Sequence, residues 1–186
     1  VLFTNIFFAA NYSLVKYISP SYVGPYGLNV LRVGISLLLF WLVWLMGNSK
    51  AGIKKEHLVR FLLCGLTGVA INQTLFIKGL TMTSTIHASL LMLCTPLLIT
   101  LFAFWILKEK ITIAKIAGLA LGISGALLLV MSKEINGTAS LNGDLFIVLN
   151  AIAYTFYFIL VKPLMYEYPP LHVIRWVFTF GFIMIL

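Results

Sequence analysis

The sequence predicts an all-α, polytopic helical membrane protein, and two observations carry that prediction. Hydrophobic residues make up 61% of the 186-residue chain and charged residues only 10%, whereas about a quarter of the residues of a soluble protein are charged. The apolar residues also fall into runs close to the ~20 residues that a helix needs to cross the hydrocarbon core. Because backbone polar groups in lipid must be satisfied within the segment, runs of this length are predicted to be helices.

Short charged connections separate the predicted spans, so neighbouring spans are expected to be antiparallel and no soluble domain is inserted between them. In chain order the seven runs are Val1–Ile18, Pro25–Met46, Leu58–Lys78, Ser84–Leu107, Thr112–Ser132, Asp144–Leu164 and Leu171–Leu186. The chain begins and ends inside apolar runs, so we expect it to be a fragment of a longer membrane protein.

The basic residues lie at the ends of the spans, where they predict orientation rather than nucleic-acid binding, despite the net charge of +8. The loops after the second, fourth and sixth spans carry nine Lys and Arg, and the loops after the first, third and fifth carry four. Because basic residues stay on the cytoplasmic side, we expect a cytoplasmic N-terminus. The predicted location is a bacterial-type inner (cell) membrane.

The sequence contains no constellation that indicates an enzyme, a metal site or a cofactor. It has no Ser-His-Asp arrangement, no His-Glu-x-x-His and no phosphate-binding glycine loop. All five acidic residues fall in loops or at span ends, and two of the three histidines are expected to be interfacial and solvated. Proton coupling through a buried acid is therefore not predicted for this chain.

A sparse set of polar side chains lies within the predicted spans. The candidates for a substrate pathway are Asn5, Tyr12, Lys16, Arg32, Asn72, Gln73, His87, Thr95, Asn150, Tyr154 and Tyr157. They either bond helices together, at about 0.6 kcal/mol for each hydrogen bond, or line a polar cavity. Arg32 and Arg175 either anchor their spans at the interface or face that cavity. In the second case, basic residues without acidic partners would favour an anionic substrate such as a carboxylate.

Two further features concern helix shape and packing. Pro96 lies midway along the fourth span, where it removes a backbone hydrogen bond to Met92 and predicts a kink. Gly118, Gly122 and Gly125 in the fifth span form a small-residue face that lets another helix approach closely. The partner of that face is either in the same chain or in a second subunit.

The first and sixth spans are similar in sequence. Both end in Leu-Val-Lys, at residues 14–16 and 160–162, and each is followed by a proline-containing loop and a span with an early arginine. A repeat of five spans must be inverted in the membrane relative to its copy, because five is an odd number. Inverted repeats recur in secondary transporters, which bind substrate between the two halves.

The order and spacing of several motifs resemble the EamA-type transporters of the drug/metabolite transporter superfamily. Residues 9–16 look like the family's first-span W-G-x-N-F-x-x-x-K stretch, although the tryptophan is missing. Residues 76–91 are similar to its A-L-x-x-T-S-A-x-x-A-x-L-L. Pro96, Leu107–Ile111, and Lys115 with the following glycines match the rest of the pattern. Lys78 and His87 stand where small or apolar residues are common in the family.

The resemblance implies ten helices in two inverted five-helix repeats. On that basis, residues 1–132 are the first repeat and residues 133–186 are the truncated start of the second, so seven of ten spans are present. It also implies export or exchange of amino acids or other small metabolites through a central cavity.

Three hypotheses follow from these observations. The leading one is a secondary transporter that works by alternating access, with the lipid bilayer and a small-molecule substrate as its partners. The alternative is a non-transporting membrane scaffold or accessory subunit, which could form a homodimer through the fifth-span glycines. A membrane-embedded transferase is the third, and the missing catalytic constellation argues against it.

Overall fold

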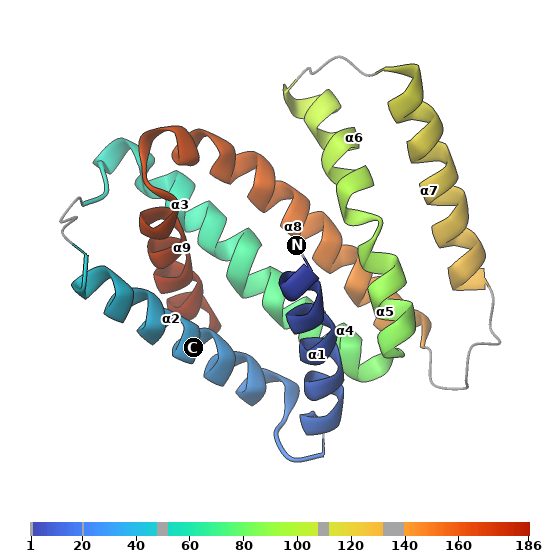
Figure 1. The fold of residues 1–186 in the computed structure, drawn as a ribbon, viewed down its shortest axis with the longest axis horizontal. Coiled ribbons are helices and arrows are strands. Elements are labelled where there is room, and N and C mark those ends of the chain that lie inside the picture. Colours follow the sequence, from blue (N-terminus) through green and yellow to red (C-terminus); the bar gives the residue numbers. More distant parts are fainter. Residues whose placement is uncertain (1, 20, 48–51, 108–111, 132–139) are drawn as a thin grey trace.

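A computed structural model describes residues 2–19, 21–47, 52–107, 112–131 and 140–186, and every element in that part of the chain is helical. Five of the predicted runs each form one α-helix (Figure 1). These helices are α1 (Leu2–Ile18), α2 (Pro25–Leu45), α7 (Ile113–Met131), α8 (Leu141–Glu167) and α9 (Pro170–Ile185).

The third run is divided into four consecutive helical segments. They are the 3-10 turn η1 (Lys55–His57), α3 (Leu58–Gly65), the π-helix η2 (Leu66–Ile71) and α4 (Asn72–Met82). A π-helix fits an extra residue into a turn, so it rotates the residues that follow it, and such segments often occur at functional sites. Here the rotation falls immediately before Asn72 and Gln73.

The fourth run is divided into α5 (Thr85–Met92) and α6 (Thr95–Leu107). The amides of Leu93 and Cys94 bond three residues back, to the carbonyls of Leu90 and Leu91. The interruption falls just before Pro96, whose ring nitrogen has no hydrogen to donate to the carbonyl of Met92. The fourth span is thus two short helices rather than one continuous helix.

The centre of the bundle is the contact between α4 and α8, where glycines let the backbones approach closely (Figure 1). A Cβ atom at Gly79 would lie 3.0 Å from the carbonyl oxygen of Gly143, and one at Gly143 would lie 2.8 Å from the backbone of Met82. Glycines also allow close packing of α3 against α9, since a Cβ at Gly65 would lie 2.9 Å from the backbone nitrogen of Gly181. The close approach brings the start of α8 against the turn that follows α4.

Helix α7 lies on the outer side of α6 (Figure 1). Gly122 packs against Leu97 of α6, whereas nothing in the described part of the chain lies within 4 Å of a Cβ built at Gly118 or Gly125. One of the three predicted packing glycines therefore contacts a neighbouring helix here. A partner for the other two stays a prediction.

The chain is a polytopic helical membrane protein. Four of the described helical stretches are long and apolar enough to cross a bilayer: Pro25–Leu45, Lys55–Met82, Thr85–Ile106 and Leu141–Glu167. Large apolar side chains such as Phe3, Trp105 and Leu121 are about three-quarters exposed. Soluble monomers rarely expose apolar surface on this scale, but helices that face lipid do so throughout.

Candidate functional site

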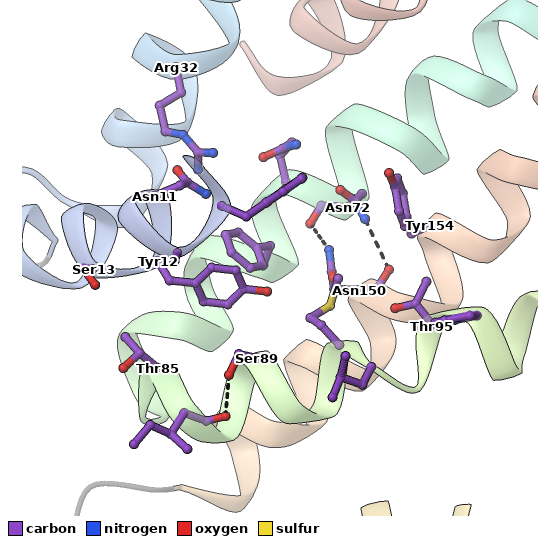
Figure 2. A pocket seen from close by; sticks show the side chains of 18 residues that line it. Asn11, Tyr12, Ser13, Arg32, Asn72, Thr85, Ser89, Thr95, Asn150 and Tyr154 are labelled. Atoms are coloured by element: carbon purple, nitrogen blue, oxygen red, sulfur yellow. Dashed lines mark hydrogen bonds between the residues drawn. The ribbon is translucent and has the colours of Figure 1, made fainter. Parts of the chain in front are cut away.

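A cavity of about 800 Å³ lies among α1, α2, α4, α5, α6 and α8 (Figure 2). Its size falls within the usual range for sites that bind small molecules, about 300–1,000 Å³. Its wall is formed by Phe8, Ala9, Asn11, Tyr12, Ser13, Arg32, Asn72, Gln73, Phe76, Thr85, Ile86, Ser89, Met92, Leu93, Thr95, Pro96, Asn150 and Tyr154.

Most of the candidate pathway residues meet at this cavity, although they come from five predicted spans. Those that line it are Tyr12, Arg32, Asn72, Gln73, Thr95, Asn150 and Tyr154. Lys16, His87 and Tyr157 do not line it, and the side chain of Asn5 lies outside the described residues. The sequence did not single out Asn11, Ser13, Thr85 or Ser89, which also face the cavity. Thr85 and Ser89 are four residues apart and so share one helix face, which was the available signal for these two.

Two asparagines hold the wall together between α4 and α8 (Figure 2). Asn150 Nδ2 donates to the carbonyl oxygen of Asn72 at 2.6 Å, and Asn72 Nδ2 donates to the carbonyl oxygen of Asn150 at 3.3 Å. The carbonyl of Asn72 lies at the end of the π-helix η2, so the side-chain bond reaches a backbone that departs from regular α geometry. Both side chains are buried.

Arg32 gives the cavity a positive charge. It extends from α2 towards Asn11 (Figure 2), and its buried Nη1 has no hydrogen-bond partner among the described residues. The residues that line the cavity include no Asp or Glu. A guanidinium at such a site is poorly compensated, and its planar donors match a carboxylate or another oxyanion.

Two polar atoms without hydrogen-bond partners among the described residues lie on the α6–α8 side of the cavity. Thr95 Oγ1 and Asn150 Oδ1 are both buried and without a hydrogen-bond partner in the described part of the chain. Buried polar atoms normally have partners, so each such atom calls for an explanation. An acceptor at Asn150 and a hydroxyl at Thr95 suit a bound molecule that carries an ammonium or hydroxyl group.

The candidates that do not reach the cavity have other partners. Lys16 Nζ donates to the carbonyl oxygens of Thr83, Leu80 and Thr81 at 2.7, 3.1 and 3.3 Å, where it caps the C-terminal end of α4. Tyr157 packs on Gly68, where a Cβ atom would collide with the ring, and stacks on Tyr154. Lys16 and Tyr157 thus fix helix contacts in this structure.

His87 does not line the cavity and pairs with Asp144, a contact that the sequence pattern did not predict. His87 Nδ1 lies 3.1 Å from Oδ2 and 3.2 Å from Oδ1 of Asp144, and both side chains are buried. Asp144 is at a span end, as predicted, but it is enclosed rather than solvated. The contact could have been anticipated from topology. His87 lies near the start of the fourth span and Asp144 at the start of the sixth, and both spans begin on the same side of the membrane when neighbouring spans are antiparallel.

Two expectations about the seventh span were wrong. His172 is buried, not solvated, because its ring stacks on that of Tyr168 at 5.2 Å. Arg175 neither snorkels to the interface nor reaches the cavity. It is 1% exposed and its guanidinium lies 4.2 Å from the ring of Trp44 and 4.7 Å from that of Trp41. Aromatic faces stabilise a desolvated cation at such distances.

The sequence of this chain is similar to those of proteins named as transporters. A family model described as the EamA-like transporter family matches residues 1–131. The chain is 27% identical over 182 residues to the uncharacterized transporter YyaM of Bacillus subtilis (strain 168), an alignment that covers 95% of this chain and 59% of YyaM.

Two further relatives carry similar names. An uncharacterized transporter of Archaeoglobus fulgidus is 24% identical over 168 residues, covering 90% of this chain and 58% of the relative. The uncharacterized transporter YoaV of Bacillus subtilis (strain 168) is 22% identical over 165 residues, covering 88% and 56%. The chain thus spans less than three-fifths of the length of these relatives. Because the family model matches well over half of it, the chain belongs to the EamA-like transporter family.

Proposed function

We propose that this chain forms part of a secondary transporter that moves amino acids or other small carboxylate-bearing metabolites by alternating access. The supporting observation is the cavity, which gathers polar side chains from helices far apart in the sequence and contains one arginine and no acid among its described lining residues. Arg32 Nη1 is buried without a hydrogen-bond partner among the described residues. Burying an uncompensated charge costs several kcal/mol, so this atom favours a site that a ligand or counter-ion occupies over a membrane scaffold.

The proposed substrate places its carboxylate on Arg32. Its amino or hydroxyl group then faces Asn150 Oδ1 and Thr95 Oγ1, the two atoms without partners in the described structure. The edge-to-face rings of Tyr12 and Phe76, with centroids 5.1 Å apart, supply an apolar wall between these polar groups. A site with a few placed polar groups in an apolar cavity is typical of small-molecule recognition.

The interrupted fourth span suggests where the protein moves. One face of the eight-residue helix α5 lines the cavity with Thr85, Ile86 and Ser89, and the helix ends at the break before Pro96. Broken helices recur at the substrate sites of transporters. We infer that the complete protein adds three spans to make ten in two inverted repeats, with the N-terminus in the cytoplasm of a bacterial-type cell.

Counterflow in proteoliposomes tests this function. Vesicles that contain the complete protein and one unlabelled amino acid are diluted into the same labelled amino acid, and the panel covers each of the common amino acids in turn. We expect at least one to exchange. Arg32→Gln should raise the KM for that amino acid at least about tenfold, since a charged hydrogen bond to substrate contributes about 1.5–3 kcal/mol.

Arg60→Gln is the matched control, because Arg60 is an exposed arginine of α3 that does not line the cavity. Its KM should equal that of the unmodified protein. Absence of exchange for every amino acid in a folded, inserted protein would refute an amino-acid substrate. An equal effect of the two arginine substitutions would refute the assignment of Arg32.

A further inference from the structure

A buried cluster of charged and polar groups lies outside the cavity, where α1 and α4 end and α5 and α8 begin. Thr83 Oγ1 donates to Asp144 Oδ1 at 2.6 Å, and His87 Nδ1 lies within 3.2 Å of both oxygens of the same carboxylate. Thr83, His87 and Asp144 are 0%, 2% and 4% exposed. Lys16 joins the cluster through the carbonyl oxygen of Thr83.

Close packing of two backbones builds this cluster. A Cβ at Gly143 would lie 2.9 Å from the backbone nitrogen of Thr83, and the amide of Ser140 donates to the carbonyl of Met82 at 3.3 Å. The residue after Gly143 is Asp144, which is therefore held against the turn between α4 and α5. Ser84, the next residue of that turn, accepts a hydrogen bond from the amide of His87 and fixes the start of α5.

The hydrogen bonds define where a proton can be added. An ionised carboxylate only accepts hydrogen bonds, so Asp144 accepts from Thr83 Oγ1 and from a hydrogen on His87 Nδ1. His87 Nε2 then carries a lone pair, and this buried atom has no hydrogen-bond partner in the described part of the chain. Transfer of a proton from hydronium forms one N–H bond at Nε2 and breaks one O–H bond of the hydronium, which leaves as water. The product is an imidazolium beside the carboxylate.

Helix α5 connects this cluster to the cavity. Thr85, Ile86 and Ser89 face the cavity, while His87 on the opposite face is tied to α8 through Asp144. The helix has only eight residues, between the turn at Ser84 and the interruption before Pro96. A change in charge at His87 therefore acts directly on the segment that forms one wall of the cavity.

The other charged groups near α5 are few. Helices α1, α4, α7 and α8 contact it. Asp144 of α8 binds the imidazole directly, and Lys16 of α1 is bound to the Thr83 carbonyl. The described titratable residues that these four helices carry elsewhere are Tyr12, Tyr17, Lys78, Lys115, Tyr154, Tyr157, Lys162, Tyr166 and Glu167. None of these has a hydrogen bond or an ion pair with His87 or Asp144.

We propose that the His87–Asp144 pair is the proton-binding site that couples transport to a pH gradient. The proposal rests on the transport function proposed above and goes beyond it by naming the coupling ion. A neutral histidine suits the task because its second ring nitrogen, here the unpaired Nε2, accepts a proton. A sodium ion is disfavoured at the same position, since the Lys16 ammonium already occupies the Thr83 carbonyl oxygen.

A gradient assay tests the coupling separately from transport. The probe is the labelled amino acid that exchanges fastest in counterflow, and the membrane potential is clamped. With one proton coupled to each substrate, each unit of pH difference supports about a tenfold accumulation at equilibrium. We expect the unmodified protein to accumulate substrate under a pH gradient but not under a sodium gradient. Asp144→Asn and His87→Gln should lose this accumulation while counterflow continues.

Glu167→Gln is the matched control, because it removes a carboxylate from the opposite end of the same helix, and it should accumulate substrate as the unmodified protein does. The proposal fails if the unmodified protein exchanges substrate but ignores the pH gradient, or if both variants accumulate normally. Absence of counterflow in the unmodified protein would instead overturn the proposed function.

A second measurement needs no substrate. Ser89→Cys reports on the cavity face of α5 and Ser13→Cys on that of α1, after both native cysteines, Cys64 and Cys94, are replaced by alanine. Taking the ratio of their thiol-labelling rates removes the effect of pH on the reagent. We expect the ratio to change severalfold between about pH 5 and pH 8. A ratio that does not depend on pH, or one that changes equally with His87→Gln, would overturn the coupling.

Discussion

Asn72 and Asn150 bind each other's backbone, each side-chain amide donating to the carbonyl oxygen of the other residue, at 3.3 and 2.6 Å. The two residues are 78 positions apart and join the third predicted span to the sixth. This reciprocal pair of hydrogen bonds lies at the end of the π-helix η2. It leaves Asn150 Oδ1 without a partner among the described residues, beside the cavity. One pair of side chains therefore fastens the two helices and leaves one acceptor unpaired among the described residues beside the cavity.

Asn150→Leu should destabilise the protein by removing one of these bonds and leaving the carbonyl of Asn72 without its donor. Interhelical hydrogen bonds in membrane proteins contribute about 0.6 kcal/mol on average and up to about 1.7. We expect a lower Tm in the thermal unfolding of the detergent-purified protein.

Ser124→Ala is the control for this loss. In the described part of the chain, the exposed Ser124 hydroxyl bonds within its own helix, to the carbonyl of Leu121. The Tm should stay unchanged in this variant. If Asn150→Leu behaved in the same way, the asparagine pair would have no part in holding α4 to α8.

Gly143→Ala should separate the start of α8 from the turn after α4. The added Cβ would lie 2.8 Å from the carbonyl carbon of Met82 and 2.9 Å from the nitrogen of Thr83, and backbone atoms cannot move aside as a flexible side chain can. Overpacking of this kind typically costs about 1–3 kcal/mol. Thermal unfolding measures this loss.

Gly52→Ala is the matched glycine substitution, because Gly52 lies outside the helices and nothing in the described part of the chain lies within 4 Å of a Cβ at that position. Its Tm should remain close to that of the unmodified protein. Equal stability of the two variants would argue against close backbone contact between α4 and α8.

The Lys54–Glu167 ion pair should contribute little stability and no pH dependence near neutrality. Its atoms are 3.1 Å apart, but both side chains are well exposed. The hydrogen bond with Glu167 raises the pKa of Lys54 above its ordinary 10.5. Because this pKa is higher in the folded protein, the stabilisation from the ion pair is fully present below the pKa of Lys54 in the unfolded chain. It disappears as the pH rises through the pKa of Lys54 in the folded protein.

Lys54→Met should therefore shift the Tm by the same small amount at every pH between about 6 and 9. High salt should abolish the shift, since the Debye length at 1 M is about 3 Å. Thermal unfolding across this pH range provides the check. If the Tm difference between Lys54→Met and the unmodified protein changed between about pH 6 and pH 9, another titrating group would have to interact with the Lys54–Glu167 pair.

Hydropathy predicted the spans well because segment length and the absence of charge are properties of the chain alone. Run boundaries such as Pro25 and Leu107 coincide with helix ends. The division of the third span by a π-helix was not predictable in this way. It depends on how Gly68 and Asn72 pack against α8, which no hydropathy pattern encodes.

The cavity was predicted in part, because polar residues within apolar spans are costly and thus informative. Tyr12, Asn72 and Asn150 line the same cavity, and their part in a substrate pathway stays a prediction. The same reasoning misjudged residues near span ends, where sequence alone does not distinguish solvent from a buried contact. Asp144 and His172 are both enclosed by partners that lie in other turns or helices, so their burial is a tertiary property.

The most direct test of the central claim is whether the exchanged substrate must carry a carboxylate. Counterflow of the fastest amino acid is measured in proteoliposomes with a competitor, either the same unlabelled amino acid or the amine that remains when its carboxyl group is removed. Because Arg32 is the charged group among the described residues of the cavity wall, the amino acid should compete fully and the amine should compete at least about tenfold less. Equal competition by the two compounds would contradict the account.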